Sequence, residues 1–455
     1  MNNKQVFMSA AELERFFADT SGNPIQHAFS RRGGHMPGAS GEPVAADAHQ
    51  SIWRQVQDQP RSGPTVMYLH VPFCANHCLF CGFYRNKWTD DASAPYTDAL
   101  LQELEMEATS PAAQSAPINA VYFGGGTPTA LHAQDLKRLI ARIRELYPLA
   151  SDCEITVEGR IYHFDNDKIE ACLDAGANRL STGTQSFDTR VRRRQGRKVS
   201  GEEARRFFEG LRDRNRAAII CDLILGLPDQ DEEIWQADLK TVVDLGLDGV
   251  DLYTLAVFPG APLFKAIEKG KISPAAPLPH QGLMYETGLT FLQRQGWRQL
   301  SSSHWASGTR ERNLYNTLIK SGAQCLAFGA GAGGNLNGYS YSVQSELAHY
   351  YDMVKKGEKP LASLARNGTL TPVLNGLAAG IETMRVDLAG LERHPAVPEG
   401  VLAYLAPLLD NWRAADLITG NTVIRLTTAG RFWHQTLLTH LKAAVAEYCG
   451  PHPEP

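Results

Sequence analysis

The sequence predicts an α/β protein built on a partial (β/α)6 barrel of the TIM type. Two observations carry this prediction. Six short runs rich in β-branched and apolar residues recur between residues 66 and 255, and amphipathic segments separate them. Buried strands that alternate with helices form parallel sheets with right-handed crossovers. In such barrels the functional residues gather where the strands end.

The predicted strands and helices follow one another without interruption. The strands are VMYLHV (66–71), INAVYF (118–123), CEITV (153–157), NRLSTGT (178–184), AAIICDLIL (217–225) and GVDLYTL (249–255). The helices between them are 96–108, 135–147, 166–176, 201–214 and 232–246. A helix near 283–294, a short run at 297–300 and a Gly-rich segment at 327–341 come next.

The flanks of the barrel differ from it in pattern. Residues 1–62 form a predicted N-terminal arm, in which Ser9 and Glu12 make a capping box and residues 31–47 are rich in Gly, Pro and Ala. A disordered leader is the alternative for this stretch. The barrel and its extension occupy 63–345. Residues 346–455 are expected to form a smaller, mainly helical or winged-like domain, with a ribbon turning at Gly420–Asn421 and a terminal helix over 429–447.

Composition excludes several classes of protein. The chain has 455 residues with 45 Lys and Arg against 49 Asp and Glu, a net charge of −4. This balance argues against a nucleic-acid partner bound through broad phosphate contact. No continuous apolar run is long enough to insert into a membrane, and the N-terminus lacks the features of a signal peptide, so a cytoplasmic location is expected. Eight cysteines are too few for a disulfide scaffold.

Three of these cysteines cluster directly after the first predicted strand. Cys74, Cys78 and Cys81 have the spacing C-x3-C-x2-C in MYLHVPFCANHCLFCGFYRNKW. Three thiolates suit a [4Fe–4S] cluster with one iron left open, because such clusters otherwise take four. A structural zinc site, with His70 or His77 as fourth ligand, is the alternative.

This motif, followed by Gly124-Gly125-Gly126-Thr127-Pro128 after the second strand, resembles the radical S-adenosylmethionine (SAM) superfamily. Within it, residues 65–345 resemble the branch of the oxygen-independent coproporphyrinogen III dehydrogenase. The resemblance implies that the open iron chelates SAM. Reduction of the cluster then gives a 5′-deoxyadenosyl radical.

The resemblance also implies two SAM sites. Its first SAM is contacted at the positions of Tyr68, Phe80, Gly125 and Glu158. Its second SAM is contacted at the positions of Gly126, Thr127, Gln185, Arg197, Asp222 and Ala256. A neighbouring SAM can lose a methyl hydrogen to the radical and then add to an sp2 carbon of a substrate, which favours methyl transfer. Gln185, Arg197 and Asp222 are therefore the candidate catalytic residues.

Asp222 also stands out without the resemblance. It lies inside the apolar run ICDLILGLP, where an unpaired buried carboxylate would be costly. A buried salt bridge is the alternative explanation.

Two departures separate the chain from the decarboxylating enzyme. Phe83 stands where that enzyme has a further cysteine, and Gly333 stands where it has a bulkier SAM contact. The run CGFYRNKW, the long leader and the C-terminal domain are more similar to the anaerobic heme-utilisation radical SAM methyltransferases (the HutW/ChuW type). These enzymes open the porphyrin of heme without oxygen and release its iron. A heme chaperone, or another porphyrin-modifying radical SAM enzyme such as a coproporphyrinogen III dehydrogenase relative, is the alternative.

The heme contacts are less defined. Candidate axial ligands are His35, His163, His280 and His304, although a lone histidine is more often structural. The candidates for binding the propionates of heme are Arg31–Arg32 or Arg190–Arg194. For the second segment, the alternative is an ordinary solvated surface. The superfamily implies a flavodoxin or ferredoxin-type electron donor.

Overall fold

Six parallel strands form the curved centre of the structure. The structure is a computed structural model that describes residues 10–33 and 41–450. The six strands lie side by side in their order along the chain. They are β2 (Thr65–Val71), β5 (Ile118–Gly125), β6 (Leu149–Gly159), β7 (Arg179–Gln185), β8 (Ala218–Leu225) and β9 (Gly249–Thr254). Each overlaps its predicted run, so the predicted barrel strands are confirmed.

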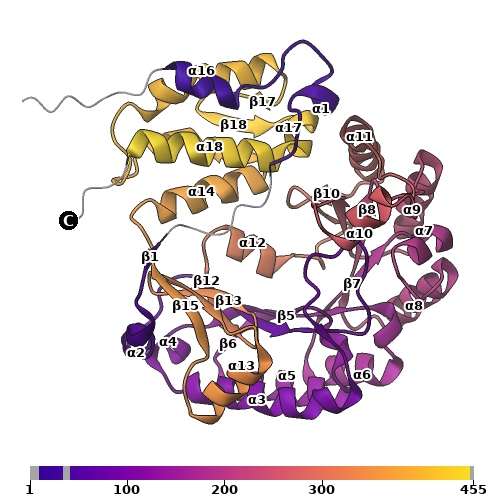
Figure 1. The fold of residues 1–455 in the computed structure, drawn as a ribbon, viewed down its shortest axis with the longest axis vertical. Helices are drawn as coiled ribbons and strands as arrows, with labels where there is room; N and C mark the ends of the chain where they lie inside the picture. The colour runs from indigo at the N-terminus through magenta and orange to yellow at the C-terminus, as the bar shows by residue number, and fades with distance from the viewer. Residues whose placement is uncertain (1–9, 34–40, 451–455) are drawn as a thin grey trace, which may run out of the picture.

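One main helix crosses from each of these strands to the next, as predicted, and Figure 1 shows these helices outside the sheet. They are α3 (Ser93–Glu107), α5 (Ala133–Leu146), α6 (Asn166–Ala175), α8 (Gly201–Arg214) and α9 (Glu232–Asp244). Leu100 of α3 and Leu139 of α5 are fully buried among the aliphatic residues of the strands. Burial of this apolar face, rather than helix propensity, supplies most of the helices' stability.

Further strands extend the sheet at both edges. Beyond β2 lie β12 (Gln324–Phe328), which runs parallel to it, and then antiparallel β13 (Gly333–Leu336), β14 (Tyr339–Val343), β15 (Leu361–Arg366) and β1 (Glu42–Pro43). Beyond β9 lie β11 (His304–Ala306) and β10 (Arg298–Gln299), the predicted short run near 297–300. The two edges do not pair within the described residues, so the barrel is partial, as predicted. The Gly-rich segment, unassigned from sequence, forms much of one edge.

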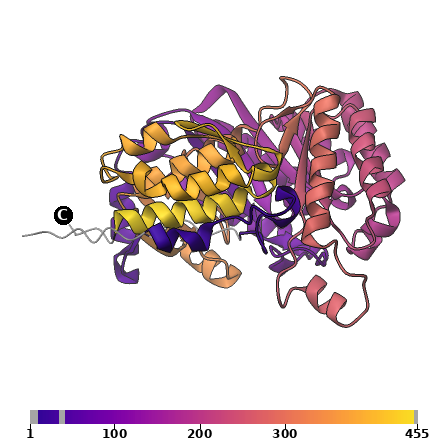
Figure 2. The same ribbon diagram turned by 90° about the horizontal axis from the view of Figure 1, so that it is seen from above.

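The C-terminal part is mainly helical and lies beside the barrel (Figure 2). Its helices are α14 (Thr371–Glu382), α15 (Leu388–Glu392), α16 (Val401–Ala414), α17 (Thr428–Phe432) and α18 (His434–Cys449). A small sheet of β16 (Arg385–Asp387), β18 (Val423–Leu426) and β17 (Ile418–Thr419) contains the predicted ribbon. The predicted terminal helix is divided at Trp433. Strand β15, which follows the predicted boundary at residue 346, still belongs to the large sheet.

The N-terminal segment joins the two parts. It contains η1 (Ala10–Phe16) and α1 (Pro24–His27). The indole nitrogens of Trp412 and Trp433 donate to the carbonyls of Phe16 and Pro24, at 3.2 and 2.8 Å. Helix α1 also packs on α11 (Leu278–Arg294), the predicted helix near 283–294. The predicted cap Ser9 and residues 34–40 of the predicted arm lie outside the described residues.

Short elements carry the loops and the remaining connections. They are α2 (His49–Gln57), β3 (Phe73–Cys74), β4 (Asn86–Lys87), α4 (Pro111–Gln114), η5 (Ile161–His163), α7 (Thr189–Arg194), α10 (Pro262–Glu268), α12 (Leu314–Lys320) and α13 (Leu347–Lys355). Three of them, β3, η5 and α7, follow the ends of β2, β6 and β7. The residues that they carry are therefore placed at one edge of the barrel.

Candidate functional site

The three clustered cysteines share the loop that follows β2. Cys74 and Cys78 are buried and Cys81 is half-buried. The backbone N–H of Cys81 donates to the carbonyl of Cys78 at 3.1 Å, and the N–H of Phe83 donates to the Cys81 sulfur at 3.3 Å. Over residues 10–33 and 41–450, no three His, Cys, Asp or Glu side chains meet closely enough to hold a single metal ion. The thiols thus share one loop without surrounding a common ion-sized point.

The surroundings of the loop fit a group that carries negative charge on sulfur. Burial raises the pKa of the Cys74 thiol, the Thr127 hydroxyl and Arg160 oppose the rise, and Cys81 and Cys78 add to it. The three thiols therefore lie within electrostatic reach of one another. Two guanidinium groups also approach Cys78, and they would offset the charge of a thiolate-bound cluster.

The first of these guanidinium groups belongs to Arg160, directly after β6. Its Nη2 donates to the Cys78 sulfur, and its Nη1 donates to the backbone carbonyl of Asn76 at 3.2 Å. Arg160 was not among the residues singled out from the sequence. A cation directly after a barrel strand, in the run EGRIYH, is the signal that would have found it.

The second guanidinium group belongs to Arg197, and it joins the cysteine loop to the end of β7. Its Nη2 donates to the Gln185 side-chain oxygen and to the Gly183 carbonyl, and its Nη1 lies 3.8 Å from the Cys78 sulfur. Gln185 adopts a left-handed backbone with φ of 70°, at an irregularity in the pairing of β7 with β8. Arg197 is 9% exposed, and its Nε has no partner within the described structure. Two predicted site residues and one predicted ligand thus meet.

The glycine turn after β5 lies against the same loop. Gly126 N–H donates to the Val71 carbonyl at 2.8 Å, and a Cβ on Gly126 would lie 2.6 Å from the Phe73 carbonyl oxygen. Gly125 has φ of 109°, and a Cβ there would lie 2.8 Å from the His70 ring. Only glycine permits this approach of the turn to the loop. The Thr127 hydroxyl lies 3.4 Å from the Cys74 sulfur.

Carboxylates gather on the neighbouring strands. Asp222 of β8 lies opposite Asp251 of β9, and Ser181 of β7 donates to Asp222 at 3.4 Å. Burial, then Asp251 and Glu158, raise the pKa of Asp222 to about 8. Burial also raises the pKa of Glu158, against a hydrogen bond donated by Tyr122. Asp222 makes no ion pair within residues 10–33 and 41–450, although the charges of Arg179 and His304 oppose the rise in its pKa.

The remaining predicted SAM residues are spread around this centre. The Tyr68 hydroxyl lies 3.0 Å from Nδ1 of His70. Phe80 packs on a small apolar cluster that includes Leu263 of α10. Ala256 is exposed just after β9. The same cluster includes Leu255 and Val257, the neighbours of Ala256 in the chain.

The proposed zinc ligands have other contacts. His70 points to Tyr68 and the glycine turn, and burial lowers its pKa to about 4. Nε2 of His77 lies 3.0 Å from the Cys81 carbonyl, and its ring stacks on Tyr84 with centroids 4.5 Å apart. Neither contact places an imidazole beside the three thiols as a fourth ligand.

The structure corrects one of the candidate heme ligands, His304. Its ring is fully buried, with Nδ1 2.9 Å from Asp251 and Nε2 2.9 Å from Glu311. Burial opposes its charge, but the two carboxylates outweigh burial and raise its pKa to about 9. Both nitrogens are therefore occupied, and His304 is not an axial ligand. His163 lies on η5, His280 lies on α11, and His35 lies outside the described residues.

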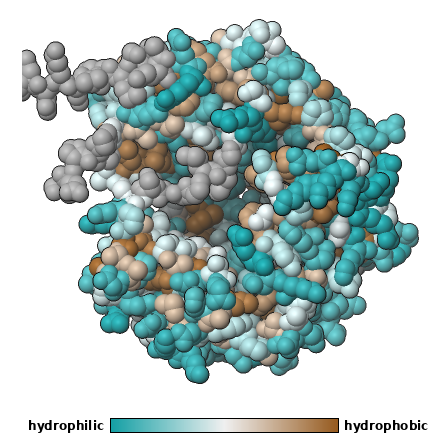
Figure 3. All heavy atoms as spheres, in the orientation of Figure 1, coloured by the Kyte–Doolittle hydropathy of each residue, from teal (hydrophilic) through white to brown (hydrophobic). Residues whose placement is uncertain are grey.

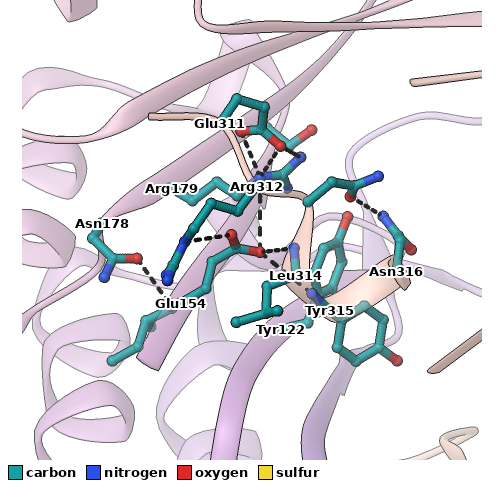
Figure 4. A network of polar contacts seen from close by, with 12 residues as sticks. Tyr122, Glu154, Asn178, Arg179, Glu311, Arg312, Leu314, Tyr315 and Asn316 are labelled. Carbon is teal, nitrogen blue, oxygen red and sulfur yellow. Dashed lines mark hydrogen bonds and ion pairs between the residues drawn. The ribbon is translucent and has the colours of Figure 1, made fainter. Parts of the chain in front are cut away.

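His304 belongs to a buried ion network that sequence reasoning missed. Figure 4 shows the part of this network around Arg179, Glu154 and Glu311. Arg179 pairs with Glu311 at 3.0 Å and lies 4.0 Å from Glu154, whose carboxylate also accepts from the N–H of Leu314 at 2.9 Å. Charged residues inside the predicted strands CEITV, NRLSTGT and GVDLYTL were the available signal. In these three strands, the charged residues belong to ion pairs inside the barrel.

Of the predicted propionate partners, Arg32 lies 5.0 Å above the Phe432 ring, and burial lowers its pKa to about 10. Arg31 is exposed. Both arginines lie on the N-terminal segment, which packs on the C-terminal helices and on α11.

Known proteins match the chain over different lengths. Residues 68–242 match the sequence pattern of the Radical SAM superfamily. Anaerobilin synthase of Escherichia coli O157:H7 is 48% identical over 420 residues, which are 92% of this chain and 93% of that protein. Oxygen-independent coproporphyrinogen III oxidase of Paracoccus denitrificans (strain Pd 1222) is 32% identical over 275 residues, 60% of this chain and 58% of that protein. Heme chaperone HemW of Bacillus subtilis (strain 168) is 29% identical over 290 residues, 63% and 75% of the two chains.

A solved structure agrees with the fold. Coproporphyrinogen III oxidase (HemN) from Escherichia coli, a radical SAM enzyme, superposes with a TM-score of 0.73 at 24% identity, over 89% of this chain and 96% of that one. This likeness confirms the predicted fold class. No helix in residues 10–33 and 41–450 combines the length and apolar character needed to cross a bilayer.

Proposed function

This chain belongs to the anaerobilin synthase family of radical SAM enzymes, and on this premise we propose that it opens the porphyrin ring of heme without oxygen. The reaction is a SAM-dependent methylation that breaks the ring and releases the iron. The contact that supports it most directly is that of Arg197, which joins Gln185 to the Cys78 sulfur. A group bound by the cysteines and a ligand bound at the end of β7 would therefore lie side by side.

The residues around the cysteine loop fit the cofactors of this family. A [4Fe–4S] cluster on Cys74, Cys78 and Cys81, with SAM on its open iron, supplies a 5′-deoxyadenosyl radical when it is reduced. The turn approaches the backbone of Phe73 at Gly126, where no side chain of the turn stands between the turn and the cysteine loop. We assign the first SAM to Tyr68, Phe80, Gly125 and Glu158.

We assign a second SAM to Gly126, Thr127, Gln185, Arg197, Asp222 and Ala256. The amino-acid part of SAM carries a carboxylate and an ammonium group. The Nε of Arg197 has no partner in the described structure, and Asp222 makes no ion pair there. Burial disfavours the charged form of Asp222, and the ammonium group of a ligand would favour it. Buried charges left without partners are costly, and a ligand of opposite charges would offset that cost.

The substrate would approach from the side of the C-terminal helices. Figure 3 shows a hollow between these helices and the barrel, in the orientation of Figure 1. One electron for each radical comes, in this proposal, from a flavodoxin or ferredoxin-type carrier. The cysteines of the described structure are all free, which suits a reducing cytoplasm.

Anoxic turnover tests the function. Cluster-loaded protein, a reductant, SAM and heme are expected to lose the Soret band and to form 5′-deoxyadenosine and a methylated linear tetrapyrrole. Use of methyl-labelled SAM tests the second site, because its methylene must appear in the product together with S-adenosylhomocysteine. Heme that stays bound and intact would instead indicate a heme chaperone, and a colourless zinc protein would contradict both interpretations.

A further inference from the structure

Arg197 is the one residue of a strongly basic segment that has a role in the reaction described so far. Residues 190–198, RVRRRQGRK, hold six cations in nine positions, although the whole chain has a net charge of −4. They form the end of α7 and the loop after it. Arg192 and Arg197 are buried there. The exposed members define what we call the basic patch: Arg190, Arg193, Arg194 and Lys198.

The basic patch is poorly neutralised. Arg194 pairs with Asp229 at 3.1 Å, which is the only ion pair of the patch in the described structure. Arg190 donates to the backbone carbonyl of Asp229 at 3.3 Å, and the ammonium of Lys198 lies 4.4 Å above the Tyr162 ring. Three of the four charges thus have no carboxylate partner, and together they attract an acidic surface.

The basic patch lies directly against the cysteine loop. The N–H of Leu79 donates to the Gln195 carbonyl at 3.3 Å, and the Asn76 amide donates to the Gly196 carbonyl at 2.9 Å. A Cβ on Gly196 would lie 3.9 Å from the Cα of Cys78. No other element separates the segment that carries the patch from the backbone of a proposed cluster ligand.

The outer side of the cysteine loop adds an aromatic contact. His77 is exposed, and its ring stacks on Tyr84. Phe83 is 76% exposed, the highest value among the large hydrophobic residues of the described structure. Exposed aromatic residues beside arginines are the composition that protein interfaces favour.

We propose that the basic patch, together with the exposed side of the cysteine loop that carries His77 and Phe83, docks an acidic one-electron carrier protein. The inference rests on the proposed function, because only a cluster that must be reduced needs a donor. One electron leaves the reduced carrier, which is oxidised by one step, and enters the cluster, which is reduced by one step. No bond forms or breaks, and no proton is transferred.

The test compares two charge-reversed proteins with the same number of changes. Arg193→Glu/Lys198→Glu alters the basic patch, and neither residue lies in the proposed SAM or cluster sites. Arg385→Glu/Arg425→Glu alters two exposed arginines that face each other across β16 and β18. Both full-length chains are loaded with the cluster under anoxia. Cluster reduction is followed by absorbance without SAM or heme, using reduced flavodoxin in one series and dithionite in the other.

We expect the patch variant to react with flavodoxin about 10-fold more slowly at low salt, because it loses electrostatic steering. Its rate with dithionite, a small reductant that needs no docking surface, stays unchanged. The β16–β18 variant behaves as wild type with both reductants, and the wild-type flavodoxin rate falls as salt is added.

Several results would overturn the assignment. Equal flavodoxin rates in wild type and the patch variant, or an equal loss in the β16–β18 variant, would remove the evidence for docking. A parallel loss with dithionite would place the effect in the cluster itself. Weaker heme binding, or loss of binding to an oligonucleotide duplex, with an unchanged flavodoxin rate would assign the patch to a different ligand. If wild type is reduced through the patch but leaves heme intact, docking stands and the proposed function fails.

Discussion

Two groups of charged residues in the same barrel differ in how completely they are paired. In the barrel interior, Arg179 and His304 are each held by carboxylates, and Glu311 is shared between them. Figure 4 shows the contact of Arg179 with Glu311. At the strand ends, Arg160 and Arg197 converge on a thiol, and Asp222 has no cation of its own in the described structure. Removing one partner of a buried pair leaves an uncompensated charge, whereas an unpaired group gains when a ligand arrives. The paired network therefore stabilises the barrel, and the unpaired group is available for ligands.

The largest expected difference between the two groups comes from Cys78→Ser. A serine hydroxyl does not replace a thiolate on iron, so we expect iron and labile sulfide to fall below one cluster per chain and heme turnover to fall below detection. Urea unfolding should change by less than about 1 kcal/mol, because Cys78 forms no disulfide. Cys449→Ser, on α18, is the matched control and should keep the cluster. Full cluster content in the Cys78 variant would contradict the ligand assignment.

Glu311→Gln should instead lower the stability of the protein. It leaves Arg179 and His304 in the core with less negative charge, so we expect about 3–5 kcal/mol loss in the free energy of unfolding. Glu145→Gln breaks an exposed pair with Arg142 and should cost less than about 1 kcal/mol. Urea denaturation measures both. Equal costs would show that the buried network is not a stabilising unit.

The same network predicts that the stability of the protein depends on pH. The pKa of His304 is about 9 in the folded protein, above its usual value of 6.5. Its contribution to stability is then complete below about pH 6.5 and is lost as the pH rises to about 9. We expect wild type to lose up to about 3 kcal/mol over this interval relative to His304→Gln. Urea denaturation at each pH measures the free energy of unfolding of both proteins. If it changed with pH in the same way in both, His304 would not be a charged imidazolium paired with two carboxylates.

Asp222→Asn should have the smallest effect on stability. The carboxylate has no cation partner in the described structure and its pKa is raised to about 8, so at pH 8 the variant should be as stable as wild type, within about 1 kcal/mol, or more stable. Its kcat/KM for SAM should fall about 10- to 100-fold, because a charged hydrogen bond to the second SAM is lost. Unchanged turnover would remove Asp222 from the proposed site.

Sequence patterns were sufficient where one local signal defines the structure. The apolar runs at 66–71 and 118–123 became β2 and β5, and the amphipathic segment 201–214 became α8, which the structure shows to begin with a complete capping box at Ser200. The Gly-rich segment 327–341 formed β13 and part of β14, which are held by antiparallel pairing with each other and with β15, and its residues lack the apolar alternation by which a strand is recognised.

The candidate site also contains residues that a local motif predicted and residues that only the fold brought to it. The cysteine spacing and the glycine turn are short motifs, and the structure places them together. Arg160 and Arg197 reach Cys78 from 82 and 119 residues away along the chain. A charged residue inside an apolar strand marked both Asp222 and Asp251, yet only Asp251 has a histidine beside it. No local pattern distinguishes these two cases.

The sequence by itself determined the order of strands and helices and the candidate residues for binding iron and SAM, because periodicity and short spacings are local properties of the chain. Tertiary structure alone decided which buried charges are neutralised and which are left for ligands. Pairing of charges depends on distances of a few ångströms between strands far apart in sequence, and those distances exist only once the barrel is folded.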